Sequence, residues 1–555
     1  MGVVRWMHLF SDGGRHNVES SEGSRDEYDV VIVGAGFSGL FALHTLRKAG
    51  FSAVVLEKAD SVGGTWYWNR YPGARSDSES PIYCFSDEFS KELLDEWEWK
   101  ERYATQPEIL AYLKWVAKRL NLEDHIQFGT EVVEAVFDEA SKRWQVVAGG
   151  GRKIGCSFLI PAVGILSDPY IPDYAGMDKF EGAMFHSADW PEDDGIFAGK
   201  RVAVIGNGAT AIQIVPELAK VAAQVTNLIR KPYHSIPGRN HALTPEDWKI
   251  IHANHTKIWE GARANGSGHP YSGFVGNALD ATPEQRRDLY ERLWQRGGFP
   301  LAISSFSDLY TDPVANATIM EFLTEKIHAI VRDPDTARQL VPTDMFGGKR
   351  TPIEHGYYSA FNLPHVSLID LKQSPILDFM SNGIRTASGD HEFDVIVWAT
   401  GFDAFTGPLM KLNLRGRGGK TLSEAWDSDI ATYLGLMVPD FPNLFMLYCG
   451  PLNPAILTNG PTLIEQQGWW LARLISHMRS NGIGTAEVSW DATRDYVRMH
   501  DEIANASIVA QTESWWTGSN IEGKPRRVLS FIGGFPAYRT LCEEAEEAYS
   551  GFIFD

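Results

Sequence analysis

The chain has 555 residues, 44% of them hydrophobic, and carries a formal net charge of −20 at pH 7. This length exceeds what one hydrophobic core organises, so two or three domains are expected. The negative charge argues against nucleic acid as a partner, because binding to phosphates requires clustered Lys and Arg side chains.

The cysteine pattern and the lack of long apolar runs narrow the class of protein further. No CxxC and no paired Cys/His spacing occurs, which argues against a metal site and against a dithiol redox centre. No run reaches the length that spans a bilayer, and residues 1–24 are expected to form a flexible leader without a core. We expect a cytoplasmic protein that binds no membrane, of unassigned oligomeric state. The cysteines are Cys84, Cys156, Cys449 and Cys542.

The first predicted folded unit is a strand, a glycine turn, a helix and a second strand over residues 28–58. Gly34, Gly36 and Gly39 match GxGxxG. These glycines provide a tight turn, close approach of a phosphate and helix–strand packing, respectively. Glu57 ends the second strand, where a carboxylate accepts hydrogen bonds from an adenosine ribose. The sequence therefore predicts a dinucleotide site here, the site of FAD.

The same order of elements recurs over residues 200–231, with Gly206, Gly208 and Ala211 at the three glycine positions. This second strand ends in Arg230 and Lys231 and has no acid. A guanidinium forks onto a 2′-phosphate that a carboxylate would repel, so the second site is expected to prefer NADPH over NADH. A solvated pair of strand-end charges is the alternative interpretation.

A third glycine marker follows the apolar strand 395–398, in the run Ala399-Thr400-Gly401. Such a strand returns to a nucleotide-binding sheet, so we expect a discontinuous FAD domain over 25–160 and 385–555 and an NADP domain over 161–240 and 335–384. Thr244 and Thr282 each precede a proline and read as helix N-caps, and Thr282 with Gln285 fits a capping box. The prediction is an α/β protein with two Rossmann-like domains and an inserted helical subdomain over 241–334.

Two nucleotide sites of opposite charge preference indicate a flavoprotein that takes a hydride from NADPH. A disulfide reductase would need a dithiol, which leaves O₂ as the common acceptor. The stretch FEGAMFHSADWP supplies Phe180, Gly182, His186 and Trp190-Pro191. It resembles the fingerprint FxGxxxHxxxW(P/D) of the type I Baeyer–Villiger monooxygenases. Flavin monooxygenases that oxidise nitrogen or sulfur carry Tyr or Phe and then a basic residue in place of Trp190-Pro191.

A second pattern of that family, (A/G)GxWxxxx(F/Y)P(G/M)xxxD, is met by GGTWYWNRYPGARSD at 63–77. The resemblance covers nearly everything after residue 25. It implies an FAD-containing enzyme that uses NADPH and O₂ to convert a small-molecule ketone to an ester or lactone through a flavin C4a-peroxide. In the family the fingerprint lies in the linker between the FAD and NADP domains, which implies that His186 and Trp190 serve domain docking more than substrate contact.

The chemistry builds negative charge beside the flavin, which a fixed cation stabilises. The resemblance assigns that role to Arg350 of GGKRTP and gives Asp77 the role of holding it, while Lys349 joins Arg230 on the 2′-phosphate. It also implies that several further residues contact the cofactors and that Trp515 closes over NADP, with Trp516 an open alternative. The further cofactor residues are Thr65, Trp66, Arg75, Tyr83 and Val132.

One departure from the family bears on the substrate. Gly460-Pro461 stand where relatives often carry Met and another apolar residue. A missing side chain there would enlarge the pocket, so we expect bulky or cyclic ketones to be accepted. Two alternatives stay open: a flavin monooxygenase that oxidises sulfur or nitrogen, and a sensor that holds FAD and NADPH without turnover.

Overall fold

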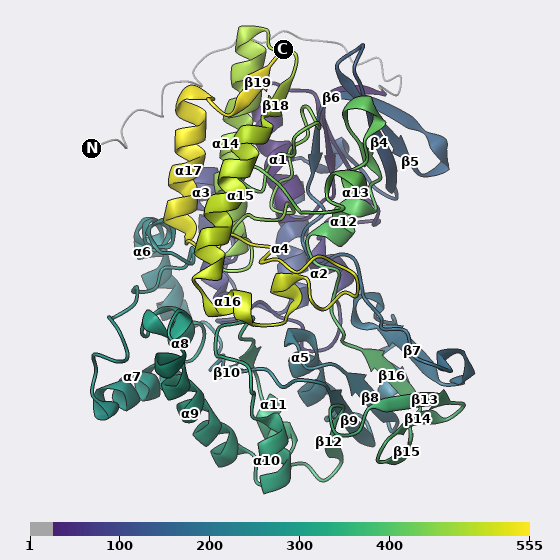
Figure 1. Cartoon of the computed structure of the whole chain (residues 1–555), viewed down its shortest axis with the longest axis vertical. Helices are drawn as coiled ribbons and strands as arrows, with labels where there is room; N and C mark the ends of the chain where they lie inside the picture. The colour runs from purple at the N-terminus through teal and green to yellow at the C-terminus, as the bar shows by residue number, and fades with distance from the viewer. Residues whose placement is uncertain (1–25) are drawn as a thin grey trace.

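The computed structural model describes residues 26–555, so the expected leader over 1–24 lies outside the described residues. Two sheets are stacked along the long axis of the molecule (Figure 1). Elements from both ends of the described chain surround the seven-stranded sheet in the upper half, and the middle of the chain forms the five-stranded sheet in the lower half. Each half has its own apolar core.

The seven-stranded sheet has the order β17-β4-β5-β6-β1-β2-β3. At its centre β1 (Glu27–Val33) runs parallel to both β2 (Ala53–Leu56) and β6 (Lys153–Pro161), as the buried apolar runs of these strands predict. The crossover helix α1 (Phe37–Lys48) packs on α14 (Gly460–Asn481). The remaining strands are β3 (Ile126–Gln127), β4 (Val132–Asp138), β5 (Arg143–Ala148) and β17 (Leu414–Arg415).

The five-stranded sheet is parallel throughout, in the order β12-β9-β8-β16-β7. The second predicted unit supplies β8 (Arg201–Ile205), α5 (Ala209–Leu218) and β9 (Gln224–Ile229). These confirm the predicted repeat of strand, turn, helix and strand. The other strands are β7 (Ala183–His186), β12 (Val366–Asp370) and β16 (Val395–Trp398).

The position of β16 corrects the expected domain boundary at residue 385. This strand pairs with β7 and β8 in the second sheet, and the antiparallel strands before it share a core with it through Phe379, Ile384 and Trp398. The chain returns to the first sheet later, at β17. The sequence Val-Ile-Val-Trp is apolar on both faces, so it fits any buried parallel strand. The antiparallel strands are β13 (Ile376–Met380), β14 (Gly383–Thr386) and β15 (Gly389–Glu392).

The helical region 241–334 contributes to three cores and is not one inserted unit, since the end of α9 adds Ile327 to the core of the second unit. Both predicted N-caps form, with capping boxes at Thr244 and Thr282. Helix α6 (Pro245–Ala264) buries Trp248 and Trp259 in the core of the first unit, against α3 (Asp87–Glu96) and α17 (Phe535–Ala548). A separate core is formed by α7 (Pro283–Arg296), α8 (Pro300–Ile303) and α9 (Pro313–Ile330).

Shorter elements complete the structure. A parallel pair of short strands, β10 (Ile236–Pro237) and β11 (Ile353–Glu354), joins the segments on either side of the helical region. Over residues 26–555 no helix is both long and apolar enough to cross a membrane. Further elements are α4 (Gln106–Arg119), α10 (Pro334–Leu340), α11 (Tyr357–Ala360), α15 (Trp490–Asn505), β18 (Ala486–Val488) and β19 (Phe552–Phe554).

Candidate active site

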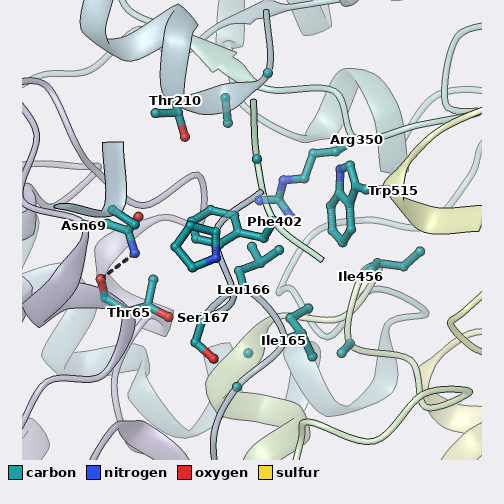
Figure 2. Close-up of a pocket in the computed structure, with 18 of the residues that line it drawn as sticks. Thr65, Asn69, Ile165, Leu166, Ser167, Thr210, Arg350, Phe402, Ile456 and Trp515 are labelled. Carbon is teal, nitrogen blue, oxygen red and sulfur yellow. Dashed lines mark hydrogen bonds between the residues drawn. The ribbon is translucent and has the colours of Figure 1, made fainter. Parts of the chain in front are cut away.

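A cavity of about 1180 Å³ lies between the two halves, at the carboxyl ends of both central strands. Open α/β sheets bind their ligands at this end. All predicted site residues line the cavity except Gly39 and Ala211, which occupy the third position of the two glycine turns. Figure 2 shows Phe402 in the middle of the residues drawn and the Arg350 guanidinium beside the Trp515 ring.

The first glycine turn has the backbone that a phosphate cradle needs. Gly34 has φ +104°, a conformation that L side chains rarely adopt, and α1 begins directly after Gly36. A Cβ placed on Gly39 would lie 1.9 Å from the carbonyl oxygen of Gly34, so only hydrogen fits there. The free N–H groups at the start of α1 point a positive dipole at the cavity. The turn therefore fits a dinucleotide pyrophosphate.

Glu57 braces this turn. Its carboxylate accepts hydrogen bonds from the backbone N–H of Ala35, at 2.5 Å, and of Ala59, at 2.8 Å. Burial raises the pKa of Glu57, and these hydrogen bonds counteract part of the rise. The carboxylate also lines the cavity, at the place predicted for ribose contact.

The second glycine turn resembles the first, except that alanine takes the place of its third glycine. Gly206 has φ +128°, and a Cβ there would lie 2.2 Å from the carbonyl oxygen of Ala399. Within the described part of the chain, a Cβ on Gly208 would meet no atom within 4 Å, which leaves room for a ligand at the start of α5. Ala211, at the third position, is fully buried in the core of the second unit.

The predicted basic groups gather around the second turn. The Lys349 Nζ lies 2.8 Å from an Asp344 carboxylate oxygen and 4.0 Å from the centre of the Tyr233 ring. Burial lowers the pKa of Lys349. The Lys231 Nζ lies 3.0 Å from a Glu513 carboxylate oxygen.

Arg230 completes the basic cluster and differs from its two neighbours. Among residues 26–555, no carboxylate lies within ion-pair distance of the Arg230 side chain, which is exposed at the cavity edge. A 2′-phosphate could bind to this guanidinium without displacing an acid.

Arg350 and Asp77 form an ion pair inside the cavity. The Nε and Nη2 atoms of Arg350 donate to one Asp77 oxygen, Oδ2, at 3.3 and 3.0 Å, and the guanidinium lies 5.2 Å from the centre of the Phe299 ring. The Asp77 side chain is 6% exposed and that of Arg350 is 33% exposed. Burial raises the pKa of Asp77, against the lowering effect of Arg350. Among residues 26–555 the second Asp77 oxygen, Oδ1, is buried and has no hydrogen-bond partner.

The aromatic groups predicted at the flavin contact one another. The Trp66 indole N–H donates to the Tyr83 hydroxyl at 3.2 Å, and the rings meet edge to face. Trp515 is partly exposed and stands beside Arg350 (Figure 2). Trp516 is buried in the core of the first unit, although it also borders the cavity. The geometry favours Trp515 over Trp516 as the group that closes the cavity.

Comparison with known proteins identifies the family. Residues 27–233 match the family model of flavin-binding monooxygenase-like proteins. An acetone monooxygenase (methyl acetate-forming) from Gordonia sp. (strain TY-5) is 40% identical over 528 residues, 94% of this chain and 98% of the relative. A Baeyer–Villiger monooxygenase from Pseudooceanicola batsensis is 39% identical over 95% of this chain and 96% of its own. The chain belongs to the Baeyer–Villiger monooxygenase family.

The relatives of this monooxygenase include solved structures and one with a different named reaction. The closed crystal structure of cyclohexanone monooxygenase matches with a TM-score of 0.93 and 38% identity, over 96% of this chain and 100% of the other. A phenazine N-monooxygenase from Lysobacter antibioticus is 38% identical over 96% of this chain and 98% of its own. The predicted α/β fold is confirmed by the first of these matches.

In this monooxygenase the specified residues of the family fingerprint lie outside the cavity lining, although Ala188 and Asp189 between them line it. His186 Nε2 lies 3.0 Å from the carbonyl oxygen of Gly401, and its Nδ1 accepts from the Ala188 N–H. Burial lowers the pKa of His186 to about 4, so the ring is neutral. Trp190 stacks on Phe197 at 4.9 Å.

The backbone of the fingerprint also contacts the first unit. The carbonyl of Trp190 accepts two hydrogen bonds from Arg70, at 3.0 and 2.8 Å. This contact lies just before the Tyr71-Pro72-Gly73 of the second family pattern. The arrangement supports the docking role that the resemblance implies.

Several residues that line the cavity belong to none of the motifs found in the sequence. His269 is buried in the wall, with Nε2 3.1 Å from the Ser78 hydroxyl, and burial lowers its pKa to about 4. Phe299 and Tyr448 also line the cavity. Ser78 follows Asp77 directly, and this adjacency is the one signal that could have pointed to it.

Proposed function

We propose that this protein is an FAD-containing, NADPH-dependent Baeyer–Villiger monooxygenase that inserts one oxygen atom of O₂ beside a ketone carbonyl, giving an ester or lactone. The observation that carries the proposal is the Arg350–Asp77 ion pair. It lies in one cavity with two glycine turns whose strands end in side chains of opposite charge. A cation fixed at this junction serves a reaction in which negative charge develops on oxygen.

The two turns fit the two cofactors. Gly34, Gly36 and Glu57 would hold FAD, and Gly206, Gly208 and Arg230 would hold NADPH. Bound there, NADPH supplies a hydride and FAD transfers the electrons to O₂. The related structures include a cyclohexanone monooxygenase bound to NADP⁺ and a complex with FAD and NADP. Lys231 and Lys349 exchange their carboxylate partners for the 2′-phosphate in this proposal.

Side chains of the protein stabilise the developing charge and exclude water. Arg350 stabilises the negative charge that develops on the ketone oxygen, and Asp77 fixes the guanidinium by two hydrogen bonds to one oxygen. Because the Asp77 side chain is buried, the Arg350–Asp77 ion pair has few alternative arrangements. Trp515 covers Arg350 from the side, so that closure excludes water from the reacting groups.

The wall near α14 supports acceptance of bulky ketones. A Cβ placed on Gly460 would meet the Tyr448 hydroxyl at 3.6 Å, an ordinary contact, so the missing side chain leaves usable space. Gly460→Met is expected to lower kcat/KM for a fused-ring ketone by about tenfold and to leave acetone unaffected. Equal kcat/KM values for the large ketone in the two proteins would remove this part of the proposal.

Oxidation of nitrogen or sulfur is the second candidate, favoured by the similarity to a phenazine N-monooxygenase. The test incubates the FAD-loaded protein with NADPH, O₂ and either cyclohexanone or a thioether, and identifies products by mass. The proposal predicts caprolactone as the main product and less sulfoxide. Sulfoxide or N-oxide without lactone would favour the second candidate, and NADPH oxidation that releases only H₂O₂ would favour a sensor that oxygenates no organic substrate.

A further inference from the structure

Two histidines and an aspartate meet on the outside of the first unit, away from the cavity. His252 and His255 lie three residues apart on α6, and Asp95 lies near the end of α3. One ligand atom of each comes within 4.8 Å of the ligand atoms of the other two. None of the three side chains lines the active-site cavity.

Helix geometry explains why the two imidazoles share a direction. Residues three apart on a helix are neighbours on one face, and the centres of the two rings lie 5.0 Å apart. The packing of α6 on α3 brings this face to Asp95. His255 is buried and His252 is half-buried, so both rings are held by their surroundings.

A fourth donor, a carboxylate oxygen, lies next to these three residues. The Nε2 atom of His252 lies 3.3 Å from an oxygen of Glu98, two residues beyond the end of α3. Two imidazoles with one or two carboxylates form a ligand set typical of Zn²⁺ and related ions. Asp95 also pairs with Lys91 at 2.6 Å. Both of these side chains are exposed, and exposed ion pairs are weak, so an ion can displace the ammonium group.

We propose that Asp95, His252 and His255 bind a divalent transition-metal ion of the Zn²⁺ class, with Glu98 or water as the fourth ligand. The ion bridges α3 and α6, which come from distant segments of the chain. No electron or proton transfer is involved beyond the loss of any proton that a ligand carries. Because the folded chain brings the ligands together, the ion stabilises the folded state.

The bridge has a structural consequence for the cavity wall. Helix α6 ends at Ala264, and the next segment carries Ser267 and His269, which line the cavity. An ion that fixes α6 on α3 therefore anchors the helix from which this part of the wall extends. The competing interpretation is a polar contact between two helices that binds no ion.

The experiment measures Zn²⁺ binding by titration calorimetry. It uses the full chain, loaded with FAD, free of a polyhistidine tag, treated with EDTA and desalted. The expected result is one Zn²⁺ per chain at about micromolar affinity, with a rise in the thermal unfolding midpoint. Co²⁺ in place of Zn²⁺ is expected to show the visible absorption bands of a nitrogen- and oxygen-ligated ion.

Variants show whether the ion binds at these residues. Asp95→Asn and His252→Ala are both expected to weaken Zn²⁺ binding at least about tenfold and to abolish the Co²⁺ bands, with ketone oxidation unchanged. His328→Ala, an exposed histidine on α9, and a His8→Ala/His16→Ala variant are the matched controls and should bind as before. The proposal is overturned if the wild type binds no Zn²⁺, or if Asp95→Asn and His252→Ala bind it as tightly as the wild type.

Discussion

The two glycine turns of this monooxygenase share a backbone conformation. They differ in the residues at the end of the second strand and in the residue at the third turn position. Behind the first, the strand ends in Glu57, and the third position is a glycine packed against its own turn. Behind the second, the strand ends in Arg230 and Lys231, and the third position is Ala211. In the proposed function the shared backbone would bind a pyrophosphate in either case, and the strand-end charge would separate one cofactor from the other.

The turns also differ in how firmly their charged groups are held. Glu57 is buried and hydrogen-bonded to its own turn. In the second turn Arg230 is exposed, and the lysines pair with Asp344 and Glu513, carboxylates that a phosphate can replace. In the proposed function the first turn would hold a resident cofactor, and the second would bind a cofactor that exchanges.

The largest effect on catalysis is expected for Arg350, which lies in the cavity that both glycine turns line. Arg350→Ala should lower kcat for ketone oxidation by about 10²- to 10³-fold, because the developing charge loses its fixed cation. Flavin absorbance should remain, since neither turn is altered. Arg338→Ala on α10 removes an exposed arginine away from the cavity and is the matched control. An Arg350→Ala protein with wild-type kcat would contradict the assigned role.

The third position of each turn gives the next prediction. Gly39→Ala places a Cβ against the backbone of Gly34, so the turn must move, and most FAD should be lost on purification. Ala211→Gly, the reverse change in the second copy, should leave FAD bound. Flavin content is measured from absorbance at constant protein concentration. Full FAD content in Gly39→Ala would show that close helix packing is not required.

The strand-end charge is tested in the second turn alone. Arg230→Ala should raise KM for NADPH about 10- to 100-fold, since a charge-assisted contact with the 2′-phosphate is lost. KM for NADH should stay the same, because NADH has no 2′-phosphate. If both KM values rise together, Arg230 holds the loop structure and does not select the cofactor.

The two glycine turns are predictable from the sequence because they depend on local geometry. Gly34 and Gly206 need positive φ, and their spacing to a strand and a helix is visible in the chain. The sheet that β16 joins could not be predicted, because the sequence of a strand that is apolar on both faces does not indicate which strands it pairs with. Ion pairs between distant segments, such as Lys231 with Glu513, leave no local pattern either.

The division of 241–334 and the cluster at Asp95 show the same limit. The capping boxes fixed where α6 and α7 begin, but which core α6 joins depends on the position of Trp248 and Trp259 against α3 and α17. His252 and His255 show helical spacing in the sequence. Their meeting with Asp95 depends on tertiary packing.

The smallest effect is expected for the acid that pairs with Lys231. Glu513→Gln removes a competitor of the 2′-phosphate, so KM for NADPH should fall about two- to fivefold, the range of an exposed ion pair. The neighbouring Glu522→Gln, in the same segment, serves as the control. A rise in KM for NADPH would mean that the Lys231–Glu513 contact supports the bound state.

A single turnover tests the joint action of both turns and Arg350 most directly. The FAD-loaded protein is mixed with one equivalent of NADPH, excess cyclohexanone and ¹⁸O₂, and the product is analysed by mass. We expect close to one equivalent of lactone carrying one ¹⁸O atom, which is the result that joint action of both turns and Arg350 requires. Full consumption of NADPH with unlabelled lactone, or with no lactone, would contradict it.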